Sequence, residues 1–203
     1  MQPAALMKKN RWQDHYALQA KKKGWLARSI FKLEELDSKY HLLHQGDRVL
    51  DLGCYPGSWI QYSLKKVGSK GEVIGIDLNK PKSLNAPNFR FVKADVLKVP
   101  LEWLDTHIGR VNVVLSDLAP RTTGVKSADA ARSMELAQRA FEIASRLLER
   151  NGAFVCKVFE GQGLQEFRSE ISGHFTTIRA IRPKAVRKGS REIYLIAQGK
   201  IFS

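Results

Sequence analysis

VLDLGCYPGSW, residues 49–59, is the stretch around which the rest of the chain can be organised. An apolar run over residues 48–52 predicts a buried strand, and a helix is expected to begin near Gly57 and to end before Gly68. Gly53 permits a sharp turn without a Cβ clash, and Gly57 lets the backbone approach a ligand. Because ligands of open α/β sheets bind beyond the carboxyl ends of the strands, this loop is a candidate binding site.

Beyond this stretch, predicted strands and helices alternate along the chain. Further strands are expected over residues 72–77, 88–94, 111–116, 153–159, 175–181 and 191–198. Apolar residues at helical spacing predict helices over residues 25–40, 127–150 and 163–173, the second of them ended by Asn151-Gly152. This alternation indicates an α/β fold with a seven-stranded, mainly parallel sheet and helices on both faces. Only a loop separates the last two strands, so the last strand is expected to run antiparallel.

The composition limits the classes of protein to which the chain can belong. Its 203 residues and 43% hydrophobic content suffice for one ordinary domain, expected over residues 25–203 after a basic arm at residues 1–24. The apolar runs are shorter than the roughly 18 residues of a membrane-spanning helix, and the first residues lack the apolar core of a secretory leader. With only Cys54 and Cys156, a disulfide scaffold is excluded. We therefore expect a cytoplasmic protein without a membrane segment.

Acidic residues follow the next two predicted strands. Asp77 ends the second strand, 24 residues after Gly53, where a carboxylate can accept hydrogen bonds from ribose hydroxyls. Asp95 follows the third strand and is placed to bind an adenine-type amino group. The alternative for each aspartate is a helix cap or a turn residue. The glycine spacing matches neither the dinucleotide fingerprint nor a P-loop, but the three features at successive strand ends favour a nucleoside-type cofactor.

Seven motifs occur in order and resemble those of the FtsJ-type ribosomal RNA large-subunit ribose 2′-O-methyltransferases: RSIFKLEEL (28–36), DLGCYPGSW (51–59), Asp77, Asp95, SDLAP (116–120), KVFEG (157–161) and SREIYL (190–195). The resemblance covers about residues 11–198. It implies a Rossmann-like, S-adenosylmethionine-dependent methyltransferase fold. It also implies that S-adenosylmethionine is bound by Gly53, Gly57, Trp59, Asp77, Asp95 and Asp117.

The sequence departs from this family's pattern at three positions. The family usually has two small residues where Cys54 and Tyr55 stand, and Gly where Ser58 stands. Tyr55 is expected to narrow the mouth of the cofactor site, while both glycines of the turn are kept. For Trp59, packing in the core is as good an interpretation as a place in the cofactor pocket.

The resemblance further implies a catalytic tetrad, which consists of Lys32, Asp117, Lys157 and Glu192. Lys157 and Asp117 lie at predicted core strands, where an unpaired charge is unfavourable and requires a partner or a function. A structural ion pair is the alternative for these two, and a solvated surface position is the alternative for Lys32 and Glu192. We predict that Lys157 is the base or the hydroxyl-orienting group and that Asp117 is aligned to it. Lys32 and Glu192 are expected to position the ribose.

The positive charge is concentrated at the two ends of the chain. Of the net charge of +14, residues 1–48 carry +5 and residues 179–203 carry +6. Cations interleaved with aromatic residues suit phosphate contacts and base stacking, and a solvated charged arm is the alternative. The candidate RNA-binding residues are Lys8, Lys9, Arg11, Lys21, Lys22, Lys23, Arg28, Arg182, Lys184, Arg187, Lys188 and Arg191.

The expected function is S-adenosylmethionine-dependent methylation of a ribose 2′-hydroxyl in RNA, at a uridine of the large-subunit ribosomal RNA. The expected partner is that RNA within the large subunit or its late assembly intermediate, and the protein is expected to act as a monomer. The alternatives are 2′-O-methylation of tRNA and a non-catalytic RNA-binding protein on a methyltransferase scaffold. No metal site is expected, because the His41 and His44 pair has no third ligand nearby in sequence.

Overall fold

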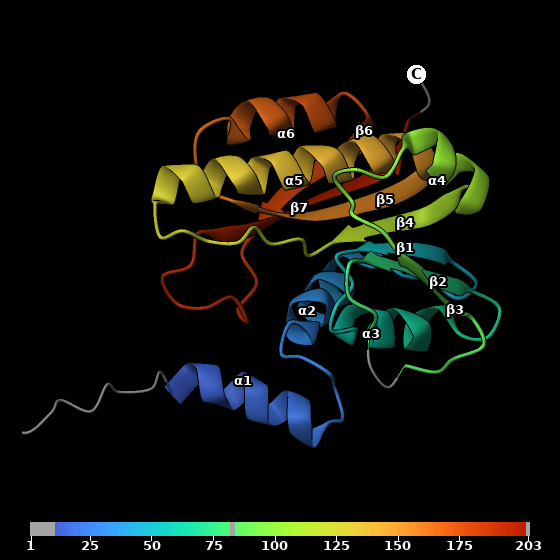
Figure 1. Cartoon of the computed structure of the whole chain (residues 1–203), viewed down its shortest axis with the longest axis horizontal. Helices are drawn as coiled ribbons and strands as arrows, with labels where there is room; N and C mark the ends of the chain where they lie inside the picture. The colour runs from blue at the N-terminus through green and yellow to red at the C-terminus, as the bar shows by residue number, and fades with distance from the viewer. Residues whose placement is uncertain (1–10, 82–83, 202–203) are drawn as a thin grey trace, which may run out of the picture.

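The computed structural model describes residues 11–81 and 84–201. Within them, seven strands form one sheet in the order β3-β2-β1-β4-β5-β7-β6 (Figure 1). The strands are β1 (Arg48–Leu52), β2 (Glu72–Asp77), β3 (Phe89–Lys93), β4 (Val111–Ser116), β5 (Leu148–Phe159), β6 (Phe175–Ile181) and β7 (Glu192–Lys200). Strand β7 is antiparallel to both of its neighbours, and the other paired neighbours are parallel. The predicted fold class is confirmed.

Helices cover both faces of the sheet (Figure 1). On one face lie α2 (Ile30–Tyr40) and α3 (Ser58–Val67), and on the other lie α4 (Leu101–His107), α5 (Lys126–Leu147) and α6 (Leu164–Ser172). Each face has its own apolar core. No helix in the described part of the chain is long and apolar enough to cross a bilayer.

The helix α1 (Arg11–Lys22) lies beside α2 rather than on the sheet (Figure 1). Ala20 of α1 is buried in the core that α2 and α3 share, and the rings of Tyr16 and Phe31 lie 5.4 Å apart. The helix predicted over residues 25–40 begins only at Ile30. The preceding turn is tied to α3 instead, because the backbone N–H of Leu26 donates to Gln61 Oε1 at 2.8 Å.

The strand periodicity decides which side chains reach which face. In β5, Cys156 and Val158 pack in the core beneath α5, so Lys157 between them points to the face of α2. Lys157 is paired in register with Tyr194 of β7, whose side chain belongs to the α2 face. The functional side chains of both strands are therefore directed to one side of the sheet.

The predicted boundary between the long helix and the fifth strand is wrong. Helix α5 ends at Leu147, and β5 begins at Leu148 rather than at residue 153. Val111 pairs with Leu148 but Val113 pairs with Ala153, so the intervening residues of β5 bulge out of the ladder. Asn151 has a φ of 63° within this bulge, so it bends the strand instead of ending the helix. The short helix α4 was not expected.

Candidate active site

A cleft of about 650 Å³ opens beyond the carboxyl ends of the central parallel strands. It is lined by Gly53, Asp77, Asp95 and Asp117, which follow or end β1 to β4 in turn. Gly53 has a φ of 77°, and a Cβ there would lie 2.6 Å from the Leu118 side chain, so only glycine fits. Four of the six predicted cofactor residues therefore share one cleft.

The two aspartates at the second and third strand ends also shape the surrounding turns. Asp77 accepts hydrogen bonds from the backbone N–H groups of Tyr55 at 3.0 Å and Asn79 at 2.8 Å. Asp95 accepts one from the N–H of Leu97 at 3.0 Å. Both carboxylates nevertheless border the open cleft and keep acceptor capacity for a ligand.

Gly57 and Trp59 do not line this cleft. Gly57 precedes α3 with a φ of 113°, and a Cβ there would lie 2.6 Å from Leu84 Cδ1. Trp59 is 3% exposed, and its indole N–H donates to the backbone O of Ser29 at 2.9 Å. Its ring lies 5.9 Å from that of Tyr194, so it packs beneath the tetrad. The cofactor role of both residues stays a prediction.

The chemistry of the cleft fits S-adenosylmethionine, which combines a nucleoside with positive charge. Beside the aspartates, Tyr55, Leu78 and Leu97 expose 50%, 57% and 41% of their surface on its rim, which offers apolar contact to a base. Asp51 of β1 is 1% exposed, and neither of its carboxylate oxygens has a hydrogen-bond partner among the described residues. Burial and the negative charges of Asp117 and Asp77 raise the pKa of Asp51 well above its ordinary value. Because burial favours the neutral form of Asp51, the carboxylates that face a cationic ligand in the cleft are those of Asp77, Asp95 and Asp117.

Next to the cleft, the four predicted tetrad residues come together from four separate elements. Lys157 Nζ donates to the backbone O of Asp117 at 2.7 Å and to Asp117 Oδ1 at 3.0 Å. Lys32 Nζ forms an ion pair with Glu192 and lies 3.9 Å from Asp117 Oδ1. The exposed fractions of the four side chains lie between 5% for Lys157 and 19% for Asp117. Two cations and two anions are thus balanced at the edge of the cleft.

A fifth residue, Tyr194, lies at the centre of the tetrad and was not among the predicted site residues. Its hydroxyl lies 2.6 Å from Asp117 Oδ1, 2.8 Å from Glu192 Oε1 and 3.1 Å from Lys32 Nζ, which donates to it. The residue is fully buried. Burial and the negative charges of Asp117 and Glu192 raise the pKa of Tyr194 well above its ordinary value. The phenol therefore stays neutral and serves as a hydrogen-bonded link between the two halves of the tetrad.

Asp117 is held in its ionised form. Burial acts to raise its pKa, but the charges of Lys157 and Lys32 and the hydrogen bonds from Tyr194 and Lys157 outweigh burial, so the pKa of Asp117 lies below its ordinary value. Its carboxylate holds Lys157 Nζ in place through the contact to Asp117 Oδ1. The arrangement can orient a hydroxyl brought to Lys157 and receive a proton from it.

The fold brings the two basic ends of the chain together beside the tetrad. Arg28, just before α2, donates to the backbone O of Ala185 in the β6–β7 loop at 2.7 Å. The N–H of Lys184 donates to Glu35 of α2 at 2.8 Å. Burial and the nearby charge of Arg187 lower the pKa of Arg28. The loop between β6 and β7 is therefore docked on α2, which carries Lys32.

The candidate RNA-binding residues are distributed around this junction. Arg191 is half-buried and donates to the backbone O of Lys126 at 2.7 Å, and Arg182 forms an ion pair with Glu160 at 2.5 Å. Lys8 and Lys9 lie outside the described residues, and Arg11 begins α1. The following candidates are exposed: Lys21, Lys22, Lys23, Arg182, Lys184, Arg187 and Lys188.

The sheet order with its reversed strand β7, and an acidic cleft at the carboxyl edge, are those of the Rossmann-like methyltransferases. A family model described as FtsJ-like methyltransferase matches residues 25–200, and the chain belongs to this family. The motif resemblance noted in the sequence is thereby confirmed.

The chain is similar along nearly its whole length to two curated proteins, each named Ribosomal RNA large subunit methyltransferase E. The one from Desulfatibacillum aliphaticivorans is 45% identical over 193 residues, which cover 95% of this chain and 93% of the relative. The one from Bdellovibrio bacteriovorus is 42% identical over 191 residues, covering 93% and 97%. A crystal structure described as that of a ribosomal RNA methyltransferase from Plasmodium falciparum matches with a TM-score of 0.77 and 28% identity, over 87% of this chain and 98% of that one.

Proposed function

We propose that this chain transfers a methyl group from S-adenosylmethionine to a ribose 2′-hydroxyl of RNA, at a uridine of the large-subunit ribosomal RNA. The observation that carries the proposal is the meeting of Lys32, Asp117, Lys157 and Glu192 beside the acidic cleft. Membership of a methyltransferase family and the names of the curated relatives support it.

S-adenosylmethionine supplies an electrophilic methyl group on a sulfonium. Asp77 and Asp95 offer acceptors for its ribose hydroxyls and its amino groups, and Gly53 lets the backbone turn next to it. Gly57, Trp59 and Asp117 complete the proposed cofactor set. These residues would hold the cofactor next to the tetrad, where it would supply its methyl group.

Lys157 is the proposed group that orients the 2′-hydroxyl and takes its proton. Methyl transfer converts a sulfonium and an alcohol into a neutral thioether and an ether, so one proton must leave the alcohol oxygen. In its neutral amine form, Lys157 donates its two N–H groups to Asp117, which leaves the lone pair on Nζ to accept the proton of the hydroxyl. Lys32 and Glu192 position the ribose from the other side of Tyr194.

The basic junction of α2 with the β6–β7 loop is the proposed docking surface for the RNA. Phosphate contacts cannot read sequence, so the choice of target must come from the shape of the RNA or of the particle that contains it. We infer that residues 1–24 form a basic arm on the single methyltransferase domain of residues 25–203. We also infer that the protein works as a cytoplasmic monomer on the large subunit or its late assembly intermediate.

Incubation with methyl-labelled cofactor tests this function. Large ribosomal subunits, naked large-subunit RNA and tRNA are compared, and labelled RNA is digested to locate the methyl group. A 2′-O-methylated uridine in the large-subunit RNA is the expected result. Label only in tRNA, or on a base instead of a ribose, would contradict the proposal.

Cofactor choice is tested separately by thermal unfolding. S-adenosylmethionine should raise the melting temperature, and NAD should leave it unchanged, because NAD carries an anionic pyrophosphate that the carboxylates of the cleft would repel. At a concentration one hundred times the dissociation constant, the stabilisation is about 2.7 kcal/mol. Equal shifts for both compounds would count against the proposed cofactor.

A further inference from the structure

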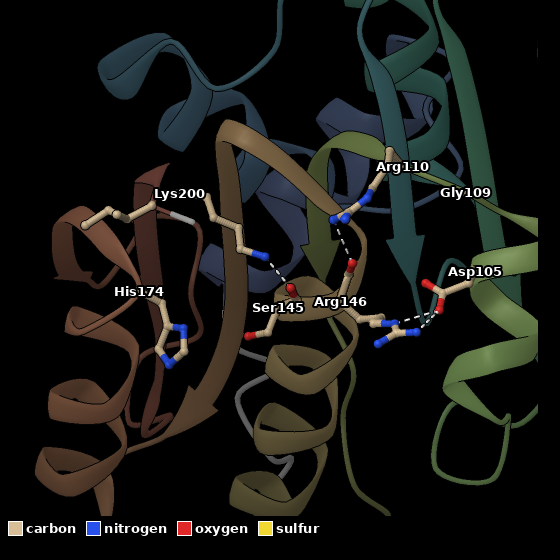
Figure 2. Close-up of a pocket in the computed structure, with 8 residues that line it drawn as sticks. Asp105, Gly109, Arg110, Ser145, Arg146, His174 and Lys200 are labelled. Atoms are coloured by element: carbon tan, nitrogen blue, oxygen red, sulfur yellow. Dashed lines mark hydrogen bonds and ion pairs between the residues drawn. The ribbon is translucent and has the colours of Figure 1, made fainter. Parts of the chain in front are cut away.

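A second hollow lies beyond the amino ends of the central parallel strands, whereas the acidic cleft lies beyond the carboxyl ends. Figure 2 shows the residues that line it. Its volume is about 610 Å³. Arg110 precedes β4 at this end, whereas Asp117 follows β4 at the other, so about 20 Å of strand separates the hollow from the tetrad. We name it the back pocket; the residues that matter for its chemistry are Asp105, Arg110, Ser145, Arg146, His174 and Lys200.

The cations of the back pocket outnumber its carboxylates. Asp105 is paired with Arg146, whose guanidinium makes two contacts of 2.5 and 2.6 Å to one carboxylate oxygen. Arg110 donates to the backbone O of Arg146 at 3.0 Å and of Leu148 at 3.3 Å. Lys200 donates to the backbone O of Ser145. Neither Arg110 nor Lys200 forms an ion pair with a carboxylate among the described residues.

Binding to the end of α5 does not account for this excess of positive charge. The carbonyl groups at a helix C-terminus are equivalent to about half a negative charge. Arg110 and Lys200 bring two positive charges to that terminus, so roughly 1.5 charges remain unbalanced. Lys200 is only 7% exposed. Arg110 and Lys200 donate to the carbonyl groups of the adjacent residues Arg146 and Ser145, and burial and the charge of Arg110 lower the pKa of Lys200.

Two further polar side chains border the back pocket. Ser145 Oγ is buried and has no hydrogen-bond partner within the described part of the chain. Its hydroxyl can donate to an anion. His174 lines the same pocket, and its ring packs edge to face against Phe141 with the centroids 5.4 Å apart. An uncompensated cation pair, an unsatisfied hydroxyl and an imidazole in one recess are the groups that bind a tetrahedral oxyanion.

We propose that the back pocket is a binding site for a phosphate group, held by Arg110 and Lys200 with Ser145 as an additional donor. The phosphate comes either from the backbone of an RNA or from a free nucleotide or inorganic phosphate. The RNA backbone as source rests on the proposed function. In that case the back pocket is a second contact with the RNA, about 20 Å of strand away from the tetrad.

Inorganic phosphate is the first probe. The melting temperature of the whole chain is measured in phosphate and in chloride at equal ionic strength. Phosphate should stabilise the wild type beyond chloride. The double variant Arg110→Gln, Lys200→Gln should bind phosphate at least tenfold more weakly, and the control Lys65→Gln, Lys70→Gln, at exposed positions, should respond as the wild type does. No phosphate-specific shift in the wild type, or equal shifts in the two double variants, overturns the proposal.

Two milder variants keep the test valid if the first double variant does not fold. Ser145→Ala removes a hydroxyl that makes no hydrogen bond to residues 11–81 or 84–201 and should weaken phosphate binding severalfold. Asp105→Asn removes the carboxylate and frees Arg146, so it should tighten phosphate binding by roughly threefold. These opposite effects are required by a phosphate site. Unchanged phosphate affinity in both variants would contradict it.

A labelled fragment of large-subunit RNA distinguishes the two sources. If the RNA backbone supplies the phosphate, the Arg110→Gln, Lys200→Gln variant should bind the fragment more weakly. The slope of log affinity against log salt concentration should also become shallower, by the amount expected for the loss of about one to two phosphate contacts. If only the response to inorganic phosphate is lost, the source is a free phosphate or nucleotide. Methyl transfer by this variant at saturating RNA should match the wild type, so failure of the pocket and failure of the proposed function give different results.

Discussion

Tyr194 holds the two halves of the tetrad together through one oxygen atom. Its hydroxyl reaches Asp117, Glu192 and Lys32, while Lys157 is bound by Asp117 alone among these residues. Hydrogen bonds to charged groups contribute about 1.5–3 kcal/mol each when a partner is removed. We therefore assign the phenol a role in positioning the tetrad and no role as a reacting group.

Replacing this phenol tests that role. Tyr194→Phe should lower the single-turnover rate of methyl transfer about tenfold. Without the hydroxyl the tetrad is less well positioned, which raises the activation free energy by roughly 1.4 kcal/mol. The affinity for S-adenosylmethionine should stay the same, since Tyr194 does not line the cleft. Tyr40→Phe, at the end of α2, is the matched control. A wild-type rate for Tyr194→Phe would show that the hydroxyl does not position the tetrad.

The sequence could predict which four charged residues form the tetrad, but not what joins them. The family motifs around Lys32, Asp117, Lys157 and Glu192 carried that information, and all four meet in the fold. Tyr194 stands two residues after Glu192 in a strand and so shares its face, a signal that could have found it. The sequence could not show that Trp59 lies beneath Tyr194, because that contact joins distant elements.

At the scale of elements, α2 is anchored by a buried carboxylate. Asp37 is 1% exposed; its Oδ1 accepts the N–H groups of Leu42 and Leu43, each at 2.9 Å. Its Oδ2 accepts the hydroxyl of Tyr62 at 2.8 Å and lies 2.8 Å from Lys66 Nζ, both on α3. These contacts fix the helix that carries Lys32 against the helix that follows the glycine turn.

The anchor gives a prediction that depends on pH. Burial acts to raise the pKa of Asp37, but hydrogen bonds from Lys66, Tyr62 and the Leu43 backbone lower it overall. A carboxylate with a lowered pKa stabilises the fold above its unfolded value of about 3.9 and loses that effect as the pH falls through the folded value. Asp37→Asn should therefore lower the free energy of unfolding by about 1.5–3 kcal/mol at pH 7 and by less at pH 3.

Urea unfolding at the two pH values measures this difference. Glu170→Gln, at an exposed position of α6, is the control and should change the stability little at either pH. A loss for Asp37→Asn that is equal at pH 7 and pH 3 would show that the charge of Asp37 is not what anchors α2.

The elements that the sequence predicted incorrectly have two physical causes, strand pairing and short length. Apolar runs such as residues 111–116 are correctly predicted as strands, because a parallel strand that is buried on both faces of the sheet is apolar along its whole length. Leu148 satisfies helical spacing equally well, but pairing with Val111 draws it into β5. Helix α4 has only seven residues, LEWLDTH, too few for a clear period. Tertiary pairing and short length thus decide what local pattern cannot.

For the whole molecule, the arrangement of charge matters more than its sum. The net charge of +14 is concentrated at the chain ends, and Arg28 and Lys184 join those ends through contacts to Ala185 and Glu35. Because Lys32 and Glu192 belong to the same two ends, their ion pair lies next to the basic junction. An RNA bound by that junction is thereby held beside the tetrad.

Removal of charge from the junction tests the docking surface. The double variant Lys184→Gln, Lys188→Gln should weaken RNA binding about tenfold, because exposed cations contact phosphates. The slope of log affinity against log salt concentration should become shallower by the amount expected for the loss of about one to two phosphate contacts. Methyl transfer at saturating RNA should be retained. Lys65→Gln, Lys70→Gln removes equal charge from other exposed positions. Equal RNA affinity and salt dependence in the two double variants would place the docking surface elsewhere.

The most direct measurement is single-turnover methyl transfer by Lys157→Ala with saturating S-adenosylmethionine and ribosomal subunits. Lys157 Nζ is fixed by the carbonyl and the carboxylate of Asp117, and the account assigns it the proton of the 2′-hydroxyl. Loss of that group should lower the rate by about 10²–10⁴-fold while cofactor binding, followed by thermal stabilisation, persists. Methylation by Lys157→Ala at the wild-type rate would contradict the assignment.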